Sequence, residues 1–218
     1  VRGLRNPNRM TRHRALRALG KVTSATEASR ELDAPALVDA LSELVATFNP
    51  ANEVRGNDFR VTVVMCLANL VGADAERWRR LAFGEDVLRG VVDRVKVVAE
   101  SEEAVVDGWK LRDVVPALHT LVMVPGNRDV LAREEMGVAS TLLRAFRGCV
   151  DEKDARSAEH VVETLAMLAG EDGVKRQFKE VSLKGELEGV VNATAELPAE
   201  AWGRTHDVGR KVLLELLR

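Results

Sequence analysis

The residue types that most often do chemistry in proteins are few in this sequence and lie far apart. The chain contains four histidines, which are His13, His119, His160 and His206. They form no His-Glu-x-x-His pattern and no other close ligand spacing. The two cysteines, Cys66 and Cys149, are too few for a four-thiolate zinc site, and no Cys-x-x-Cys occurs. We therefore expect no metal and no cofactor.

Motifs for nucleophilic or phosphate chemistry are also missing from the sequence. It contains no Gly-x-Ser-x-Gly turn and no glycine-rich loop that ends in Lys-Ser or Lys-Thr. The paired acids Glu102–Glu103 and Glu134–Glu135 are sequence neighbours, so the two members of a pair do not share one face of a helix. Only an active site assembled from distant residues stays open, and we expect no enzyme.

The composition favours a core of closely packed helices. Hydrophobic residues make up 46% and charged residues 30% of the 218 residues, whereas aromatic residues make up only 4% and tyrosine is absent. Strands favour aromatic and β-branched residues, so this composition argues against a β-sandwich or barrel. The net charge of −2 gives the whole molecule no strong preference for nucleic acid or acidic lipid.

Two features of the sequence bear on location. No apolar run approaches the length of about 18 residues that a membrane-spanning helix needs, and the best stretch, Val61–Ala73, is shorter and includes Thr62 and Asn69. Both cysteines lie in apolar stretches with helical spacing, which is typical of buried free thiols in a reducing compartment. We expect a cytoplasmic protein, with the nucleus as the alternative.

Positive charge is concentrated at the start of the chain. Residues 1–22 include no acid and contain Arg2, Arg5, Arg9, Arg12, Arg14, Arg17 and Lys21. These positions recur every few residues around a helix rather than along one stripe, which favours a solvated surface or contact with an upstream segment. Nucleic-acid binding through this basic helix is the alternative function, although we do not expect it.

A repeat of about 50 residues is the main signal in the sequence. Leu-x-x-Leu begins at Leu16, Leu67, Leu118, Leu165 and Leu213, so successive copies are 51, 51, 47 and 48 residues apart. Two further apolar sets keep the same period, and they are Leu37, Leu88, Val138 and Leu187, then Leu32, Leu81, Leu131 and Phe178. Because three sets share one spacing, we expect stacked repeats with a continuous core.

Each repeat is expected to contain three helices. The expected first helices are Thr26–Leu32, Ala75–Phe83, Arg128–Glu135 and Val174–Glu180. The second helices are Pro35–Phe48, Asp86–Ala99, Gly137–Arg147 and Lys184–Thr194. The third helices are Phe59–Val71, Asp107–Val124, Ser157–Ala169 and Arg204–Leu217, preceded by a single third helix at Asn8–Val22.

Glycine and proline divide the chain into these repeats. The stretches Gly72–Asp74, Pro125–Asn127 and Gly170–Gly173 are expected to separate them. We expect one all-α domain over residues 1–218, with a partial repeat at 1–22 and repeats near 23–72, 73–124, 125–170 and 171–218. The solitary opening helix predicts that the native chain continues upstream.

These residues resemble the armadillo repeat family. The clearest stretch runs from Gly126 to Leu143 and is similar to the first helix, glycine and second helix of an armadillo repeat, while Leu67–Val71 is similar to the end of a third helix. The resemblance implies an α-α superhelix of three-helix repeats whose third helices line a groove for a partner. It also implies that Asn69 grips the backbone of an extended peptide. The tryptophan that nuclear-import receptors carry one turn earlier is missing at all five equivalent positions.

The resemblance also gives candidate site residues on the third helices. Counting back from the position of Asn69 by four, three and four residues defines a strip that we call the predicted strip. Its members are Arg14, Asp58, Thr62, Met65, Asn69, Trp109, Asp113, Thr120, Arg156, His160, Glu163 and Met167. Ala18, Thr11 and Pro116 fall at equivalent positions, and we expect Pro116 to kink its helix or mark its start.

The family further implies a function in protein–protein interaction. We expect a scaffold or adaptor, and the armadillo build favours a regulator of a small GTPase. A section of a larger solenoid subunit and a co-chaperone are the alternatives. Among the tryptophans, Trp78 is expected to pack between helices, while Trp109 and Trp202 follow loops and are expected to be partly exposed.

Overall fold

The computed structural model describes residues 2–24, 34–48, 56–72, 81–101, 108–179 and 181–216. Over these ranges the chain forms eleven α-helices and one 3-10 helix, and no strand is present. The elements are α1 (Arg9–Ser24), α3 (Ala34–Ala46), α4 (Gly56–Val71), α5 (Glu85–Glu100), α6 (Leu111–Met123), α7 (Pro125–Leu131), η3 (Glu134–Met136), α8 (Val138–Asp151), α9 (Ala155–Leu168), α10 (Asp172–Phe178), α11 (Val181–Ala195) and α12 (Ala199–Leu216). The all-α fold class expected from the sequence is confirmed for this part of the chain.

Most of the expected helices are present, with ends shifted by a few residues. The expected first helix Thr26–Leu32 lies outside the described residues, as does most of Ala75–Phe83. The expected separator Pro125–Asn127 is instead the first turn of α7, because proline fits the first position of a helix, where its missing N–H is not needed. α7, which was expected to run to Glu135, ends at Leu131. The short helix η3 follows and leads to Gly137, whose φ of 60° is a left-handed conformation that suits glycine.

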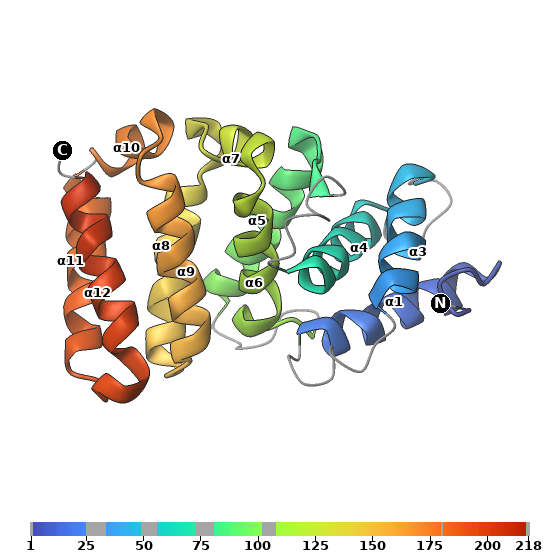
Figure 1. Ribbon diagram of the computed structural model, residues 1–218, viewed down its shortest axis with the longest axis horizontal. Helices are drawn as coiled ribbons and strands as arrows, with labels where there is room; N and C mark the ends of the chain where they lie inside the picture. The colour runs from blue at the N-terminus through green and yellow to red at the C-terminus, as the bar shows by residue number, and fades with distance from the viewer. Residues whose placement is uncertain are drawn as a thin grey trace.

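The helices pack in a regular order along the molecule (Figure 1). In one row α1 packs against α4, α4 against α6, α6 against α9, and α9 against α12. In a second row α5 packs against α8, and α8 against α11, while each of these helices also packs against the next helix of the first row. The first row faces the viewer in Figure 1, and the short helices α7 and α10 lie across its upper edge.

The apolar positions that define the repeat form the core. Leu16, Leu67, Leu118 and Leu165 are each at most 1% exposed, and they lie on four successive helices of the first row. The other two sets are buried as well, at Leu37, Leu88, Val138, Leu187, Leu81, Leu131 and Phe178. Leu213 on α12 is half-buried, and Leu32 lies outside the described residues. The hydrophobic period therefore predicts the buried positions of α1, α4, α6 and α9 correctly.

Two buried amide side chains join neighbouring layers. The Asn127 Nδ2 group donates to the carbonyl oxygens of Leu81 at 2.6 Å and Leu121 at 3.1 Å, while Asn127 Oδ1 accepts from Phe83 N at 3.1 Å. Gln177 Oε1 accepts from Ala139 N at 3.3 Å in the first turn of α8. Both amides bind backbone groups near the start of a second-row helix, where intrahelical partners are missing.

The third helix expected over Asp107–Val124 begins four residues later, at Leu111. Its start is fixed by Asp113, whose carboxylate accepts a hydrogen bond from Lys110 N at 3.0 Å. The backbone N–H groups at a helix start have no acceptor within the helix, and the Asp113 carboxylate supplies one. Pro116 lies inside α6, so it neither ends the helix nor marks its beginning. It removes one intrahelical hydrogen bond of α6.

Both tryptophans expected to be partly exposed are buried, so this prediction is wrong. Trp109 is 4% exposed and Trp202 is 3% exposed. The Trp109 ring packs against α1 at Gly20, where an added Cβ would lie 2.4 Å from a ring carbon, and Lys21 Nζ lies 4.8 Å from the ring centroid. A glycine on one helix thus makes the space that buries the indole of a distant segment. Trp78 lies outside the described residues.

Candidate partner-binding groove

The first row of helices carries a hollow with a volume of about 1070 Å³. We call it the groove. It is lined by the ends of α1 and α4, the segment before α6, one face of α6, the turn between α8 and α9, and the first two turns of α9. The lining residues are Lys21, Asn69, Gly72, Gly108, Lys110, Arg112, Asp113, Pro116, His119, Thr120, Met123, Glu152, Lys153, Asp154, Arg156, Ser157 and His160.

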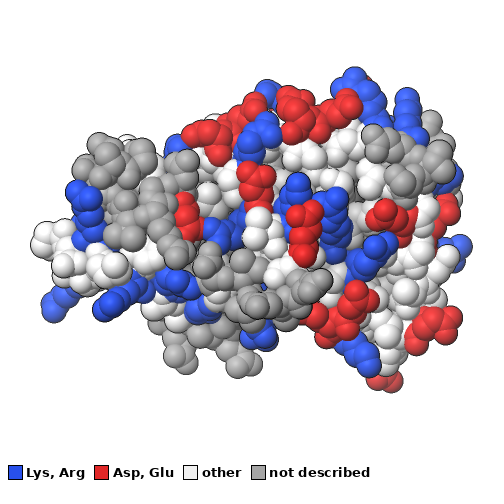
Figure 2. All heavy atoms as spheres, turned by 180° about the vertical axis from the view of Figure 1, so that it is seen from behind, with Lys and Arg blue, Asp and Glu red and all other residues white. Residues whose placement is uncertain are grey.

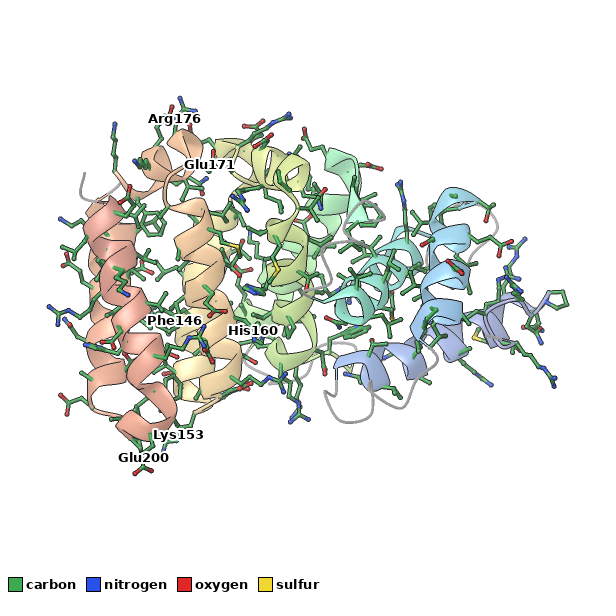
Figure 3. All side chains as sticks on the ribbon, in the orientation of Figure 1. Phe146, Lys153, His160, Glu171, Arg176 and Glu200 are labelled. Atoms are coloured by element: carbon green, nitrogen blue, oxygen red, sulfur yellow. The ribbon has the colours of Figure 1, made fainter. Side chains whose placement is uncertain are left out.

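Five residues of the predicted strip line this groove: Asn69, Asp113, Thr120, Arg156 and His160. They come from α4, α6 and α9, which are consecutive in the first row. Figure 3 shows His160 between α9 and α6 and Lys153 at the lower end of the molecule, where α8 turns into α9. The spacing rule therefore brings together residues that are as much as 91 positions apart in the sequence.

Three members of the predicted strip lie inside the protein rather than on an outward face. Met65 is 1% exposed, Thr62 is 4% exposed, and Trp109 is buried against α1. α4 packs against α1, α3, α5 and α6, and every residue from 61 to 68 is buried. A helix enclosed on all sides has no free face, so Thr62 and Met65 belong to the core.

The remaining strip residues are placed elsewhere. Asp58 pairs with Arg94 on α5, and Glu163 accepts from Arg204 on α12 at 2.5 Å. Met167 is half-buried and packs against the core, whereas Arg14 is exposed on α1. Ion pairs between neighbouring helices thus account for the two acids, and none of these four residues lines the groove.

The groove also contains charged residues that the strip does not include. Lys110, Arg112 and Lys153 line it beside the predicted Asp113 and Arg156. They lie at the starts of α6 and α9 or in the segments before them. Lys110 and Lys153 lie outside the helices, where a count by helical period does not apply, and Arg112 lies on α6 but not at one of the counted positions. The charges at both helix starts are nevertheless visible in the sequence.

Two of the three acids in the groove are bound within the protein. Asp113 Oδ2 accepts from Lys21 Nζ at 2.5 Å as well as from Lys110 N. Asp154 is the N-cap residue of α9, and its carboxylate accepts from Ser157 N at 3.1 Å and from Ser157 Oγ at 2.7 Å. Glu152 is exposed.

A histidine pair forms one wall of the groove. The ring centroids of His119 and His160 are 5.0 Å apart, with the rings edge to face. The Thr164 hydroxyl donates to the His160 carbonyl oxygen at 2.6 Å, so it accepts from His119 Nδ1 at 3.1 Å. This network assigns the proton to Nδ1 of the His119 ring. Burial and the neighbouring His160 lower the pKa of His119 to about 4, so the ring is neutral at pH 7 even though Glu163 lies 3.8 Å from its Nε2.

Asn69 lies in the groove with part of its amide unsatisfied. Its Oδ1 is buried and has no hydrogen-bond partner among the described residues, while the residue as a whole is partly exposed. A buried amide oxygen without a donor costs about 1–3 kcal/mol. A ligand with an N–H group that reaches this amide would remove that cost.

Reactive groups are not assembled in the part of the chain that the structure describes. No group of three or more His, Cys, Asp or Glu side chains there could hold a metal ion. Burial raises the pKa of the Cys66 thiol to about 12 and also raises the pKa of the Cys149 thiol, so both stay protonated at pH 7. Over the same ranges, none of the helices has the length and apolar character needed to cross a membrane.

The basic N-terminal segment does not form one free positive surface. Arg5 donates to Glu43 at 2.9 Å, and Arg12 donates to the carbonyl oxygens of Asn6 and Pro7. Arg9 and Arg14 are exposed on α1. Seen from the rear, positive and negative side chains are intermixed over the C-terminal helices, whereas mostly positive side chains are visible at the N-terminal end (Figure 2).

No family model, no curated protein and no solved structure matches this chain. The groove is therefore interpreted from its own residues.

Proposed function

We propose that the chain is an armadillo-like α-α superhelix that binds a protein partner in the groove along α4, α6 and α9. The order of helix contacts supports the superhelix, because each helix of the first row packs against the next one and a second row lies behind it. The expected repeats, including the partial repeat at residues 1–22, are the layers of this stack.

One observation carries the proposed function. Five residues chosen by helical spacing line one hollow of about 1070 Å³, although they come from three helices. The hollow mixes charged, polar and apolar groups, among them Arg156, Thr120 and Met123. Such a mixture is typical of a surface for a transient protein partner rather than of a core.

The amide of Asn69 favours an extended segment of the partner. An extended peptide has backbone N–H and C=O groups that it does not use itself. A side-chain amide can bind both kinds of group, and Asn69 has an oxygen that lacks a donor. The armadillo resemblance implies the same role for this residue.

The experiment compares partner capture by three forms of the chain. The groove variant carries Asn69→Ala and His160→Ala, and the control variant carries Asp93→Ala and Lys96→Ala, which change exposed residues of α5. We expect a stoichiometric protein partner to be retained by the native chain and by the control variant, and to be lost by the groove variant.

Circular dichroism and thermal unfolding first establish that all three forms are folded. Equal retention of the partner by the groove variant would refute the proposed site. Retention of chaperones alone by the native chain would refute the proposed function.

The partner class that we put forward first is a small GTPase, on the strength of the armadillo resemblance. We propose that the chain changes the rate at which this GTPase releases nucleotide. We expect the native chain to change the release of a fluorescent nucleotide from its GTPase, and the groove variant to have no effect. Unchanged release in the presence of a captured GTPase would make the chain a scaffold instead.

A further inference from the structure

Four cations in the groove have no carboxylate partner among the residues that the structure describes. Lys110, Arg112, Lys153 and Arg156 all line the hollow, and the described part of the chain provides an ion pair for none of them. On the neighbouring helix α12, by contrast, Arg204 is paired with Glu159 at 2.8 Å. The four cations are therefore gathered in one place without local neutralisation.

The acids that share the groove do not compensate for these cations. The carboxylates of Asp113 and Asp154 are bound to Lys21 and Ser157 and to backbone N–H groups at two helix starts. Only Glu152 stands exposed beside the four cations. Excess positive charge between protein walls raises the local concentration of anions.

The backbone at Lys153 adds a second, independent observation. Lys153 has φ of 57°, the only non-glycine residue with positive φ in the described chain. It follows the end of α8, where Lys153 N donates to the carbonyl oxygen of Val150 at 3.1 Å and Asp154 N donates to that of Cys149 at 2.8 Å. Glycine is the usual residue at this position, because a left-handed conformation strains a lysine backbone. Strain that persists at a binding surface is a sign of function.

From these observations we infer that the groove binds an acidic segment of a protein chain, with the partner's Asp or Glu side chains placed among Lys110, Arg112, Lys153 and Arg156. This inference rests on the proposed function, and it adds the chemistry of the partner. The carboxylates pair with the four cations, while the backbone of the same segment reaches Asn69. Thr120, His119 and His160 line the same groove.

A peptide fits this site better than a nucleic acid. A DNA duplex carries one charge per about 1.7 Å of its axis, and proteins that bind it contact many phosphates along an extended surface. Here the unpaired cations are confined to one hollow that also holds Glu152, while the rear face carries both signs of charge. A short acidic segment matches this limited charge, and its backbone supplies the N–H donor for Asn69.

The test uses three labelled peptides of about ten residues, roughly 33–36 Å when extended. One alternates Glu and Ser, the second has Gln in place of Glu, and the third has Lys in place of Glu. Fluorescence anisotropy measures their binding to the intact chain at low and high salt. We expect only the Glu peptide to bind, with a Kd that rises as salt is added.

Charge-reversed variants locate the binding. Arg112→Glu with Arg156→Glu should raise the Kd of the Glu peptide by at least about tenfold, because two favourable charge contacts become repulsive. The matched control, Lys96→Glu with Lys179→Glu, makes the same change in net charge at two exposed positions outside the groove. It should leave the Kd within about twofold.

The other outcomes separate this inference from the proposed function. If the Glu and Gln peptides bind equally well and Asn69→Ala abolishes the binding of both, the preference for acidic segments is refuted. The groove would then still be a binding site for peptides. Failure of the Glu peptide to bind at low salt would overturn the inference, whatever the capture experiment shows. The inference would also be overturned if a single-stranded RNA bound more tightly than the Glu peptide and lost its binding in the Arg112→Glu, Arg156→Glu variant. The groove would then be a nucleic-acid site.

Discussion

Replacing Leu118 by alanine tests the helix register on which the groove depends. Leu118 is fully buried on α6, in the middle of the first row. α6 packs against α4 and α9 in that row and against α5 and α8 behind it. A shortened side chain would leave a cavity whose walls belong to several helices, which cannot all move inward together.

The size of the effect follows from this enclosure. A buried Leu→Ala change costs about 2–5 kcal/mol, and sites that cannot collapse lie in the upper part of that range. We therefore expect a loss of about 3–5 kcal/mol for Leu118→Ala. The matched control is Leu214→Ala, because Leu214 on α12 is 61% exposed, and it should cost less than about 0.5 kcal/mol.

Urea unfolding measures both changes. Circular dichroism follows the helices, and tryptophan fluorescence follows the buried rings of Trp109 and Trp202. If the two probes report the same transition, unfolding is two-state and a free energy of unfolding can be calculated. This check is needed because proteins built of stacked repeats do not always unfold in one step. A cost below about 1 kcal/mol for Leu118→Ala, or equal costs for the two variants, would mean that the assigned register of α6 is wrong.

Three further predictions concern single positions. Gly173→Ala should destabilise the protein by about 1–3 kcal/mol, because the new Cβ would lie 2.1 Å from the Ala132 carbonyl oxygen. A Cβ added at Gly170 has no atom within 4 Å, so the control Gly170→Ala should leave the stability unchanged. Thermal unfolding compares the two variants. Lys153→Gly should raise the free energy of unfolding by up to about 1 kcal/mol, because glycine adopts the left-handed conformation without strain. The same change should weaken the binding of the Glu peptide, since it removes a cation. A lower free energy of unfolding would contradict the assigned strain. The native free energy of unfolding should fall as pH drops from 6.5 to about 4, because the unfolded His119 binds a proton before the folded one does. His119→Asn should flatten this dependence by roughly 2–3 kcal/mol in urea unfolding measured across that range.

The positions of the helices and their buried faces could be predicted from the sequence alone. The Leu-x-x-Leu period placed Leu67, Leu118 and Leu165 in the core, and all three are at most 1% exposed. This worked because a helix repeats every 3.6 residues, so its apolar stripe is a local property of each segment. The ends were less certain, since capping at α6 depends on one carboxylate, Asp113.

The tertiary structure decided which polar positions remain accessible. Periodicity does not reveal how many neighbours a helix has, so Met65 and Thr62 on the enclosed α4 could not be told apart from Thr120 and His160 on the groove. The burial of Trp109 likewise depends on Gly20, a residue of another helix.

Charge pairing also had to come from the structure. Lys21 pairs with Asp113 from 92 residues away, and Asp154 caps α9, so neither acid is paired with the four groove cations among the described residues. The sequence fixes which charges exist, whereas the packing of separate helices decides which of them meet. Electrostatic energy depends on distance and burial, and both are set between segments rather than within them.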